Sequence, residues 1–185
     1  MGLSIHYSGT IKTYDLVPQL VEEIGDVCAA MQWKTTTIGN EQLNGIAFSS
    51  YKCEPLFLTI NKKGKLVSPI LLEYKIEPAT TISVKTQFAR IDVHIAVIKF
   101  LRYLAEKYFS KFDLEDERGY WETNNEQFLA KRFKDYEAVF DFVIGALKNI
   151  PARKNETADS LASRITAYLE QKMSNDGLSS NRHSS

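Results

Sequence analysis

The sequence is poor in cysteine, balanced in charge and free of long apolar runs. Its two cysteines, Cys28 and Cys53, predict reduced thiols that behave as small buried hydrophobes. Lys and Arg total 23 and Asp and Glu total 23, and this neutral balance argues against a nucleic-acid partner. No apolar run approaches the roughly 18 residues of a membrane span, and residues 1–10 do not read as a signal peptide. We therefore expect a cytoplasmic protein with no membrane partner.

The motifs that carry common enzyme chemistry are also missing. The sequence contains no G-x-G-x-x-G or Walker phosphate loop, no G-x-S-x-G nucleophile turn, no H-E-x-x-H and no C-x-x-C. Its glycines are scattered singly, so no phosphate cradle is evident. We therefore expect no cofactor, and we assign no catalytic or metal-binding residue from motifs.

Hydrophobic periodicity predicts an α+β fold. Residues 3–7 alternate as a strand, and residues 14–31 carry an apolar stripe at helical spacing. Five strand-like segments follow, with a hairpin turn closed by Gly64 and an edge or bulge at Pro69. A buried helix then starts near Asp92. The five segments cover residues 33–38, 43–51, 56–60, 65–68 and 81–88. We expect one mostly antiparallel, curved sheet with helices packed on one face.

A further helix is expected over residues 124–150, because Thr123 and Glu126 fit a capping box. Its apolar residues recur at steps of four and three, the clearest periodic signal in the chain. This stripe should be buried, and it consists of Leu129, Phe133, Tyr136, Phe140, Val143 and Leu147.

The chain is expected to divide near residue 150. Residues 1–150 should form a single α+β domain, residues 151–173 a linker with an amphipathic helix, and residues 174–185 a disordered tail. The C-terminal helix has a thin apolar stripe. We therefore expect it to be detachable from the core, dispensable for folding and available for self-association.

An acidic segment with two aromatic residues is the main candidate for binding a partner. A solvated loop, a surface for a basic protein and a hard-cation site are three interpretations of this loop or small hairpin. Tyrosine and tryptophan beside charge are typical of interface anchors, although they also cover small cores. The candidate residues are Asp113, Glu115, Asp116, Glu117, Tyr120 and Trp121.

A second set of polar residues is the candidate for a pocket between the sheet and the long helix. His6 and His94, together with Cys53 and Glu54, would form an acid/base or metal set if the fold brought them together. The alternative is that the two histidines only hydrogen-bond locally. Glu54 beside Cys53 is expected to raise the pKa of the thiol, which disfavours a thiolate nucleophile.

Several strings resemble a family of uncharacterised bacterial proteins over residues 3–150. They are LSIHYSGTIK, CEPLFLTI, TQFARIDVHIAVIKFLRYLAEKYF and GYWETNN. The resemblance implies a bacterial cytoplasmic origin and a single domain, and it gives no residue a role.

The sequence favours a non-enzymatic protein-interaction module, since catalytic motifs are missing and acidic and aromatic residues cluster locally. Immunity proteins and antitoxins of bacteria have a similar size and similar acidic surfaces, which is an analogy only. The alternative is an enzyme or small-ligand binder that uses the pocket between the sheet and the long helix.

Overall fold

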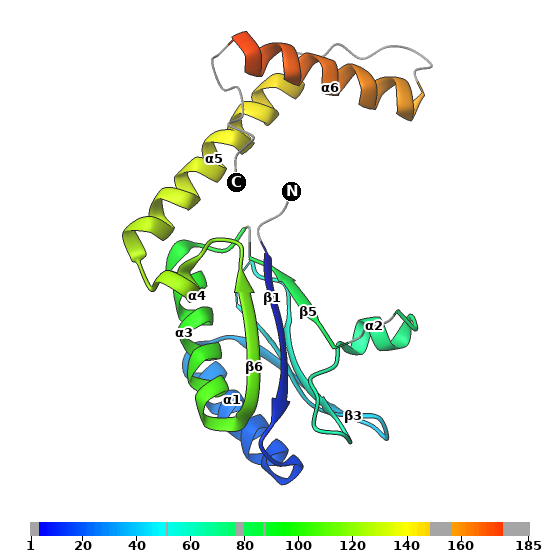
Figure 1. Ribbon diagram of the computed structural model, residues 1–185, viewed down its shortest axis with the longest axis vertical. Coiled ribbons are helices and arrows are strands. Elements are labelled where there is room, and N and C mark those ends of the chain that lie inside the picture. Colours follow the sequence, from blue (N-terminus) through cyan, green and yellow to red (C-terminus); the bar gives the residue numbers. More distant parts are fainter. Residues whose placement is uncertain (1–3, 51, 77–79, 87, 149–156, 176–185) are drawn as a thin grey trace. The chain divides into compact units, whose positions relative to one another are not determined.

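The computed structural model describes residues 4–50, 52–76, 80–86, 88–148 and 157–175 (Figure 1). The chain forms two compact units, Met1–Ala130 and Lys131–Ser185. The predicted α+β class is confirmed, with antiparallel strands and a C-terminal helix. The domain boundary near residue 150 stays a prediction.

The first unit alternates short strands and helices (Figure 1). Its elements are β1 (Ser4–Ile11), the single turn η1 (Tyr14–Leu16), α1 (Val17–Ala30), β2 (Lys34–Gly39), β3 (Leu43–Ser49), β4 (Leu56–Asn61), α2 (Pro69–Glu73), β5 (Ile82–Lys85), α3 (Ile91–Tyr108), β6 (Phe109–Asp116) and α4 (Tyr120–Thr123). The helix α5 (Glu126–Lys148) begins in this unit, and α6 (Ala158–Asn175) lies in the second.

The strands lie in two antiparallel sheets, ordered β5-β1-β6 and β2-β3-β4, where the sequence predicted one. The segment after the Gly64 turn connects the two sheets. Lys65 bridges to Thr10 of β1, while Leu66 bridges to Ile60 of β4. Lys65 and Leu66 pair with different sheets. Residues 65–68 therefore connect the two sheets instead of forming the predicted strand. Gly64 has the expected positive φ of 77°.

Two other predictions for single elements were wrong. Pro69 begins the short helix α2 instead of lying in an edge strand. Proline suits the first turn of a helix, and the Ser68 side chain caps α2 by accepting a hydrogen bond from the Leu71 N–H. In addition, most of the segment predicted as an acidic loop or small hairpin belongs to the strand β6, which follows α3 and pairs with β1.

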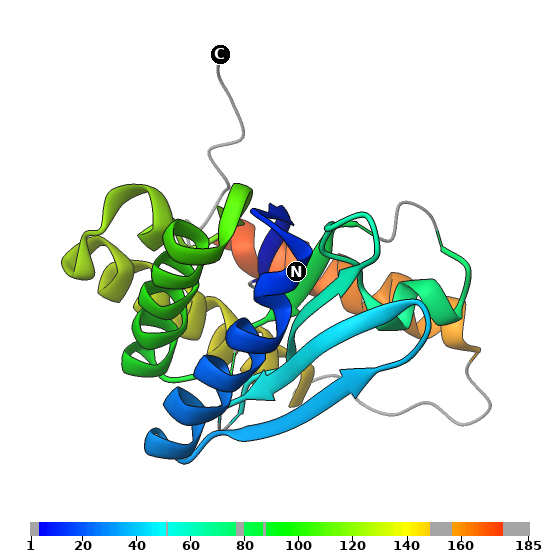
Figure 2. The same ribbon diagram turned by 90° about the horizontal axis from the view of Figure 1, so that it is seen from below.

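The core lies between the sheets and the two long helices of the first unit. Ile5 and Tyr7 of β1 are buried, and α1 buries Val17, Leu20, Ile24 and Cys28. Figure 2 shows α1 against the β2-β3-β4 sheet with α3 beside it. Burial raises the pKa of Cys28 to about 11, and both cysteines are free thiols, as predicted.

Glu23 joins α1 to α3 through a cluster of polar side chains. Its carboxylate lies 2.8 Å from Nζ of Lys107, and it accepts hydrogen bonds from the hydroxyl groups of Tyr103 and Tyr108. Burial raises the pKa of Glu23, but the hydrogen bonds from Lys107, Tyr103 and Tyr108 outweigh this effect and lower the pKa to about 2. Glu23 should therefore contribute stability that depends on pH.

Replacing Glu23 with glutamine should lower the free energy of unfolding by about 1 kcal/mol at neutral pH, because bonds to a charged group are lost. The folded-state pKa is depressed. The contribution of Glu23 is therefore fully present above its ordinary value of 4.5 and is lost as the pH falls towards about 2. Urea unfolding at several pH values measures this, with the exposed neighbour Glu22→Gln as control. A difference between Glu23→Gln and wild type that persists undiminished near pH 2 would contradict the prediction.

The second unit consists of most of α5 together with α6. Along the predicted stripe, Leu129 is buried in the first unit, while Phe133 and Tyr136 are half-buried. The side chains of Phe140, Val143 and Leu147, the predicted linker over 151–156 and the tail after 175 lie outside the described residues. In the described part of the chain, no helix has both the length and the apolar content to span a membrane. Self-association through α6 stays a prediction.

Candidate functional site

The acidic residues predicted to lie in a loop belong mostly to the strand β6. Its sequence alternates apolar and acidic residues, which is the period of a strand with two different faces. Phe112 and Leu114 point inward, and Asp113 and Glu115 are exposed on the other face. Pairing with β1 over residues Ile5 to Ile11 fixes this register, so the acids project from one side of the β5-β1-β6 sheet.

The outer face of this sheet is polar and mixed in charge. Glu115 lies opposite His6, and Asp113 lies opposite Ser8 in the β1–β6 register. Asp113 is 3.2 Å from Nζ of Lys111, and Oε1 of Glu117 is 3.7 Å from Nε2 of His6. A shallow hollow of about 250 Å³ lies between His6, Ser8, Asp113 and Glu115. We call the exposed carboxylates of this face, those of Asp113, Glu115 and Glu117, the acidic face.

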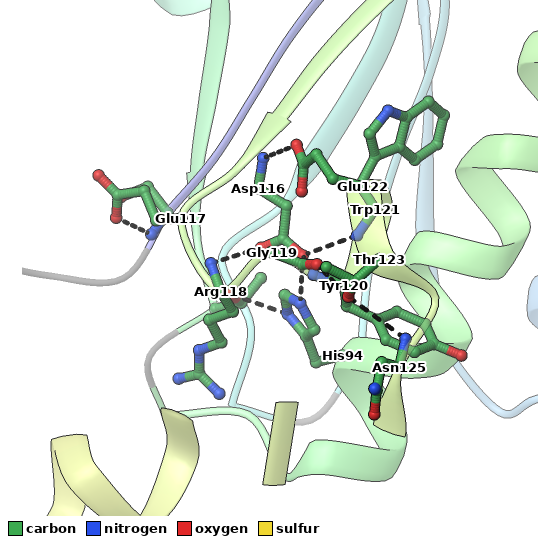
Figure 3. Close-up of polar contacts among 12 residues, drawn as sticks. His94, Asp116, Glu117, Arg118, Gly119, Tyr120, Trp121, Glu122, Thr123 and Asn125 are labelled. Atoms are coloured by element: carbon green, nitrogen blue, oxygen red, sulfur yellow. Dashed lines mark hydrogen bonds and ion pairs between the residues drawn. The ribbon is translucent and has the colours of Figure 1, made fainter. Parts of the chain in front are cut away.

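Asp116 has a different role, because it is buried with 4% of its surface exposed. Its carboxylate accepts hydrogen bonds from the backbone N–H groups of Arg118, Tyr120 and Trp121 at 3.0, 2.9 and 3.2 Å. These bonds fold the chain after β6 into a tight turn that leads into α4 (Figure 3). The turn is therefore organised around one buried carboxylate.

His94 of α3 is the side-chain partner of Asp116. Its Nε2 lies 3.1 Å from Oδ2 of Asp116, and its Nδ1 lies 3.2 Å from the hydroxyl oxygen of Thr86. An ionised carboxylate only accepts hydrogen bonds, so Nε2 carries the proton that is donated to Asp116. Figure 3 shows the imidazole ring directed at the turn. The pair joins α3 to the end of β6.

Burial raises the pKa of Asp116, but the hydrogen bond and the charge interaction with His94, followed by the N–H groups of Arg118 and Tyr120, outweigh it. The pKa of Asp116 therefore lies below its ordinary value. The carboxylate is ionised and fully used inside the protein. Asp116 consequently stabilises the turn and is not available to an external partner.

The two aromatic residues of the predicted patch do not lie on the acidic face. Tyr120 is buried with 1% exposure. Trp121 is half-buried, with its ring 6.2 Å from that of Phe112 and 5.1 Å from the Arg102 guanidinium. Phe112 belongs to the inward side of β6, so Trp121 packs at the α3 side of the sheet. The structure thus brings Asp113, Glu115 and Glu117 together and separates them from Asp116, Tyr120 and Trp121.

The predicted capping box is replaced by a simpler cap. Glu126 does not reach back to Thr123; its carboxylate lies 3.4 Å from Nζ of Lys99. The Asn125 side chain accepts the hydrogen bond from the Phe128 N–H at 3.0 Å and caps α5. Thr123 instead ends α4, where its hydroxyl donates to the Gly119 carbonyl. Because α4 ends at Thr123, the N-cap of α5 is Asn125, two residues after the predicted position.

His6 and His94 engage different partners on opposite sides of the β5-β1-β6 sheet. Nδ1 of His6 lies 2.7 Å from the Ser83 hydroxyl on the outer face, whereas His94 is fully buried with Asp116. This arrangement corresponds to the local hydrogen bonding that was the alternative to an acid/base or metal set. Among the residues that the structure describes, no three His, Cys, Asp or Glu side chains are grouped as metal ligands.

Cys53 and Glu54 are held at the end of β5. The Glu54 carboxylate accepts a hydrogen bond from the Lys85 N–H at 2.8 Å, and the Cys53 thiol lies 3.9 Å from the Lys85 carbonyl oxygen. Burial raises the pKa of Cys53 to about 11; a hydrogen bond with Ser50 lowers it, and the charge of Glu54 raises it further. The predicted effect of Glu54 on the thiol is confirmed, and at neutral pH the thiol is protonated.

Comparisons with protein-family models, with curated proteins and with solved structures found no match to this chain. The resemblance of residues 3–150 to a family of bacterial proteins stays a prediction.

Proposed function

We propose that the protein is a non-enzymatic interaction module that binds a basic protein partner through its acidic face. The observation that carries this proposal is the regular projection of carboxylates from one exposed sheet face. Asp113 is 62% exposed and Glu117 is 38% exposed, while Glu115 between them is also exposed. Alternate positions of β6 place Asp113 and Glu115 side by side, and Glu117 follows directly after the strand.

Charge and rigidity both support binding at this face. Lys111 pairs with Asp113 on this face, but the three carboxylates of the acidic face still attract an oppositely charged partner and raise the rate of association. The acidic face is also held in place, because Glu117 accepts a hydrogen bond from the Ser4 N–H at 2.6 Å and β6 ends in the Asp116 turn. A preformed surface loses little conformational entropy on binding. Immunity- or antitoxin-like behaviour remains an analogy within this proposal.

The alternative function, an enzyme or small-ligand binder between the sheet and α3, has less support. Its polar candidates His6, Cys53, Glu54 and His94 each bond to local groups and do not converge. On the α3 side, Val97, Ile98, Leu101 and Leu104 are all fully buried. An apolar, filled layer favours structural packing over a ligand pocket at this position.

The test of the acidic face begins with a partner identified by cross-linking and pull-down from the source cell. A double variant, Asp113→Lys with Glu115→Lys, should then bind that partner at least about tenfold more weakly, mainly through a slower on-rate. The on-rate of the wild type should also fall as salt is added, because exposed charges are screened. Surface plasmon resonance at two ionic strengths measures both effects.

A matched control changes the same amount of charge elsewhere. Glu22 and Asp26 are exposed on α1, so Glu22→Lys with Asp26→Lys alters the net charge equally and leaves the acidic face intact. This control should bind like the wild type. Equal weakening in both double variants, or recovery of no basic protein at all, would contradict the proposal.

A further inference from the structure

A groove on the β2-β3-β4 side of the first unit adjoins a smaller hollow that reaches the acidic face, since Lys65 and Thr80 line both and Asp113 lines the hollow. Its volume is about 550 Å³, and its walls come from the β2–β3 turn, the end of β4, the link after Gly64 and α2. Its volume falls within the range of pockets that hold small molecules, roughly 300–1,000 Å³. We call it the lysine groove, and its lining includes Leu43, Val67, Leu72, Lys62, Lys63 and Lys65.

The floor of the lysine groove is apolar. Leu43 and Val67 are 2% and 5% exposed, so the half-buried Leu72, which packs against them, supplies most of the accessible apolar surface. The cluster that these three side chains form is separate from the interior under α3, since it lies between β3 and α2. Apolar surface at the base of a groove favours a ligand with an apolar body, which removes that surface from water.

One wall of the groove carries three lysines on a rigid turn. The Asn61 side chain accepts hydrogen bonds from the N–H groups of Lys63 and Lys65, both at 3.0 Å. The Gly64 carbonyl accepts a further bond from the Ile11 N–H at 2.8 Å and fixes the turn to β1. The backbone that presents the lysines is therefore ordered before any ligand binds.

The lysines leave the groove with a net positive charge. Lys62, Lys63 and Lys65 are exposed, and among the described residues none of them forms an ion pair. Among the described residues that line the groove, Glu41 is the acidic one, and Asp113 lines the adjoining hollow with Lys65. The three ammonium groups outnumber these two carboxylates and favour an anion at this wall.

We propose that the lysine groove binds a small amphipathic carboxylate, with its apolar body on Leu43, Val67 and Leu72 and its carboxylate at Lys62, Lys63 and Lys65. The juxtaposition of an apolar floor with a basic wall is specific to such a ligand. A purely apolar molecule would leave the ammonium groups uncompensated, and a simple inorganic anion would gain no contact with the apolar surface of Leu72. The two proposals concern different charged groups, the lysines of the groove and the carboxylates of the acidic face, so each can fail without the other.

Octanoate is a suitable probe because it carries both a carboxylate and an apolar chain. Acetate keeps only the charge, and 1-octanol keeps only the apolar chain. Titration of the full chain, followed by NMR, should show saturable binding of octanoate with shifts at Leu43, Val67 and Leu72. Acetate and 1-octanol should bind at least about tenfold more weakly, because each loses one of the two contributions. The triple variant Lys62→Gln, Lys63→Gln, Lys65→Gln should weaken octanoate binding by at least about tenfold as well.

Two matched variants separate this site from general electrostatics. Lys34, Lys85 and Lys134 are exposed outside the groove, so their triple change to glutamine should leave octanoate binding unchanged. Leu72→Gln should weaken it while the lysines remain. No saturation at about 10 mM octanoate, equal binding of 1-octanol, or the same affinity in the Lys62, Lys63, Lys65 variant would overturn the proposal.

Discussion

Replacing Asp116 with alanine is expected to lower the free energy of unfolding by about 3–5 kcal/mol, because it removes one partner of a buried charged network. The change leaves His94 without its 3.1 Å partner and leaves the N–H groups of Arg118, Tyr120 and Trp121 without their acceptor. Alanine offers no acceptor, and the site is closed to water around it. The turn before α4 should therefore lose its order along with the stability of the domain.

Asp113→Ala is the matched control, since it removes the same side chain from the same strand. Asp113 is 62% exposed, and its ion pair with Lys111 is also exposed. Such pairs contribute about 0–1 kcal/mol, so this variant should unfold nearly as the wild type does. Urea unfolding monitored by circular dichroism measures both variants. Equal effects at residues 113 and 116 would show that Asp116 is not the centre of the turn.

The two long helices of the first unit, α1 and α3, follow closely from local sequence. The stripe predicted over residues 14–31 corresponds to η1 and α1, with Val17, Leu20, Ile24 and Cys28 buried at helical spacing. The buried helix expected from Asp92 is α3, Ile91–Tyr108. Helical periodicity depends on residues three and four positions apart, so a short window of sequence contains the whole signal.

Strands are harder to predict because their partners lie far away in sequence. Residues 112–116 alternate as a strand does, but they pair with β1. Asp113, for example, lies opposite Ser8, which is more than a hundred positions earlier in the sequence. An acidic segment without a visible partner is typical of a loop. The same limit applies to residues 65–66, whose bridges to Thr10 and Ile60 divide them between two sheets.

The sequence identified the acidic residues of the candidate site by composition, but not the strand that carries them. The structure places Asp113 and Glu115 on the same face because they occupy alternate positions of β6. The burial of Asp116 depends on His94, 22 positions away, and on backbone N–H groups of a turn that forms around it. No local pattern contains that information. The contact of Trp121 with Arg102 was likewise not predicted, because it depends on how α3 packs against the sheet.

Gly45→Ala is expected to be the most damaging single-methyl addition in the β2-β3-β4 sheet. Gly45 lies in the central strand β3, between Ile38 of β2 and Thr59 of β4. A Cβ atom at this position would lie 2.1 Å from the Leu58 carbonyl oxygen and 2.7 Å from the Thr59 Cα. Both are backbone atoms, so no side-chain rotation relieves the overlap. Separation of β3 from β4 should cost about 3 kcal/mol or more.

Gly25→Ala makes the same chemical change where there is room for it. Gly25 lies within α1, and a Cβ atom there meets nothing within 4 Å. Alanine has the higher helix propensity, so this variant should be more stable than wild type by about 0.5–1 kcal/mol. Thermal and urea unfolding of the two variants should therefore shift in opposite directions. A Gly45→Ala protein that unfolds like the wild type would contradict the prediction. It would mean that β3 and β4 do not approach closely at Gly45, in the register that pairs Ile46 with Leu58.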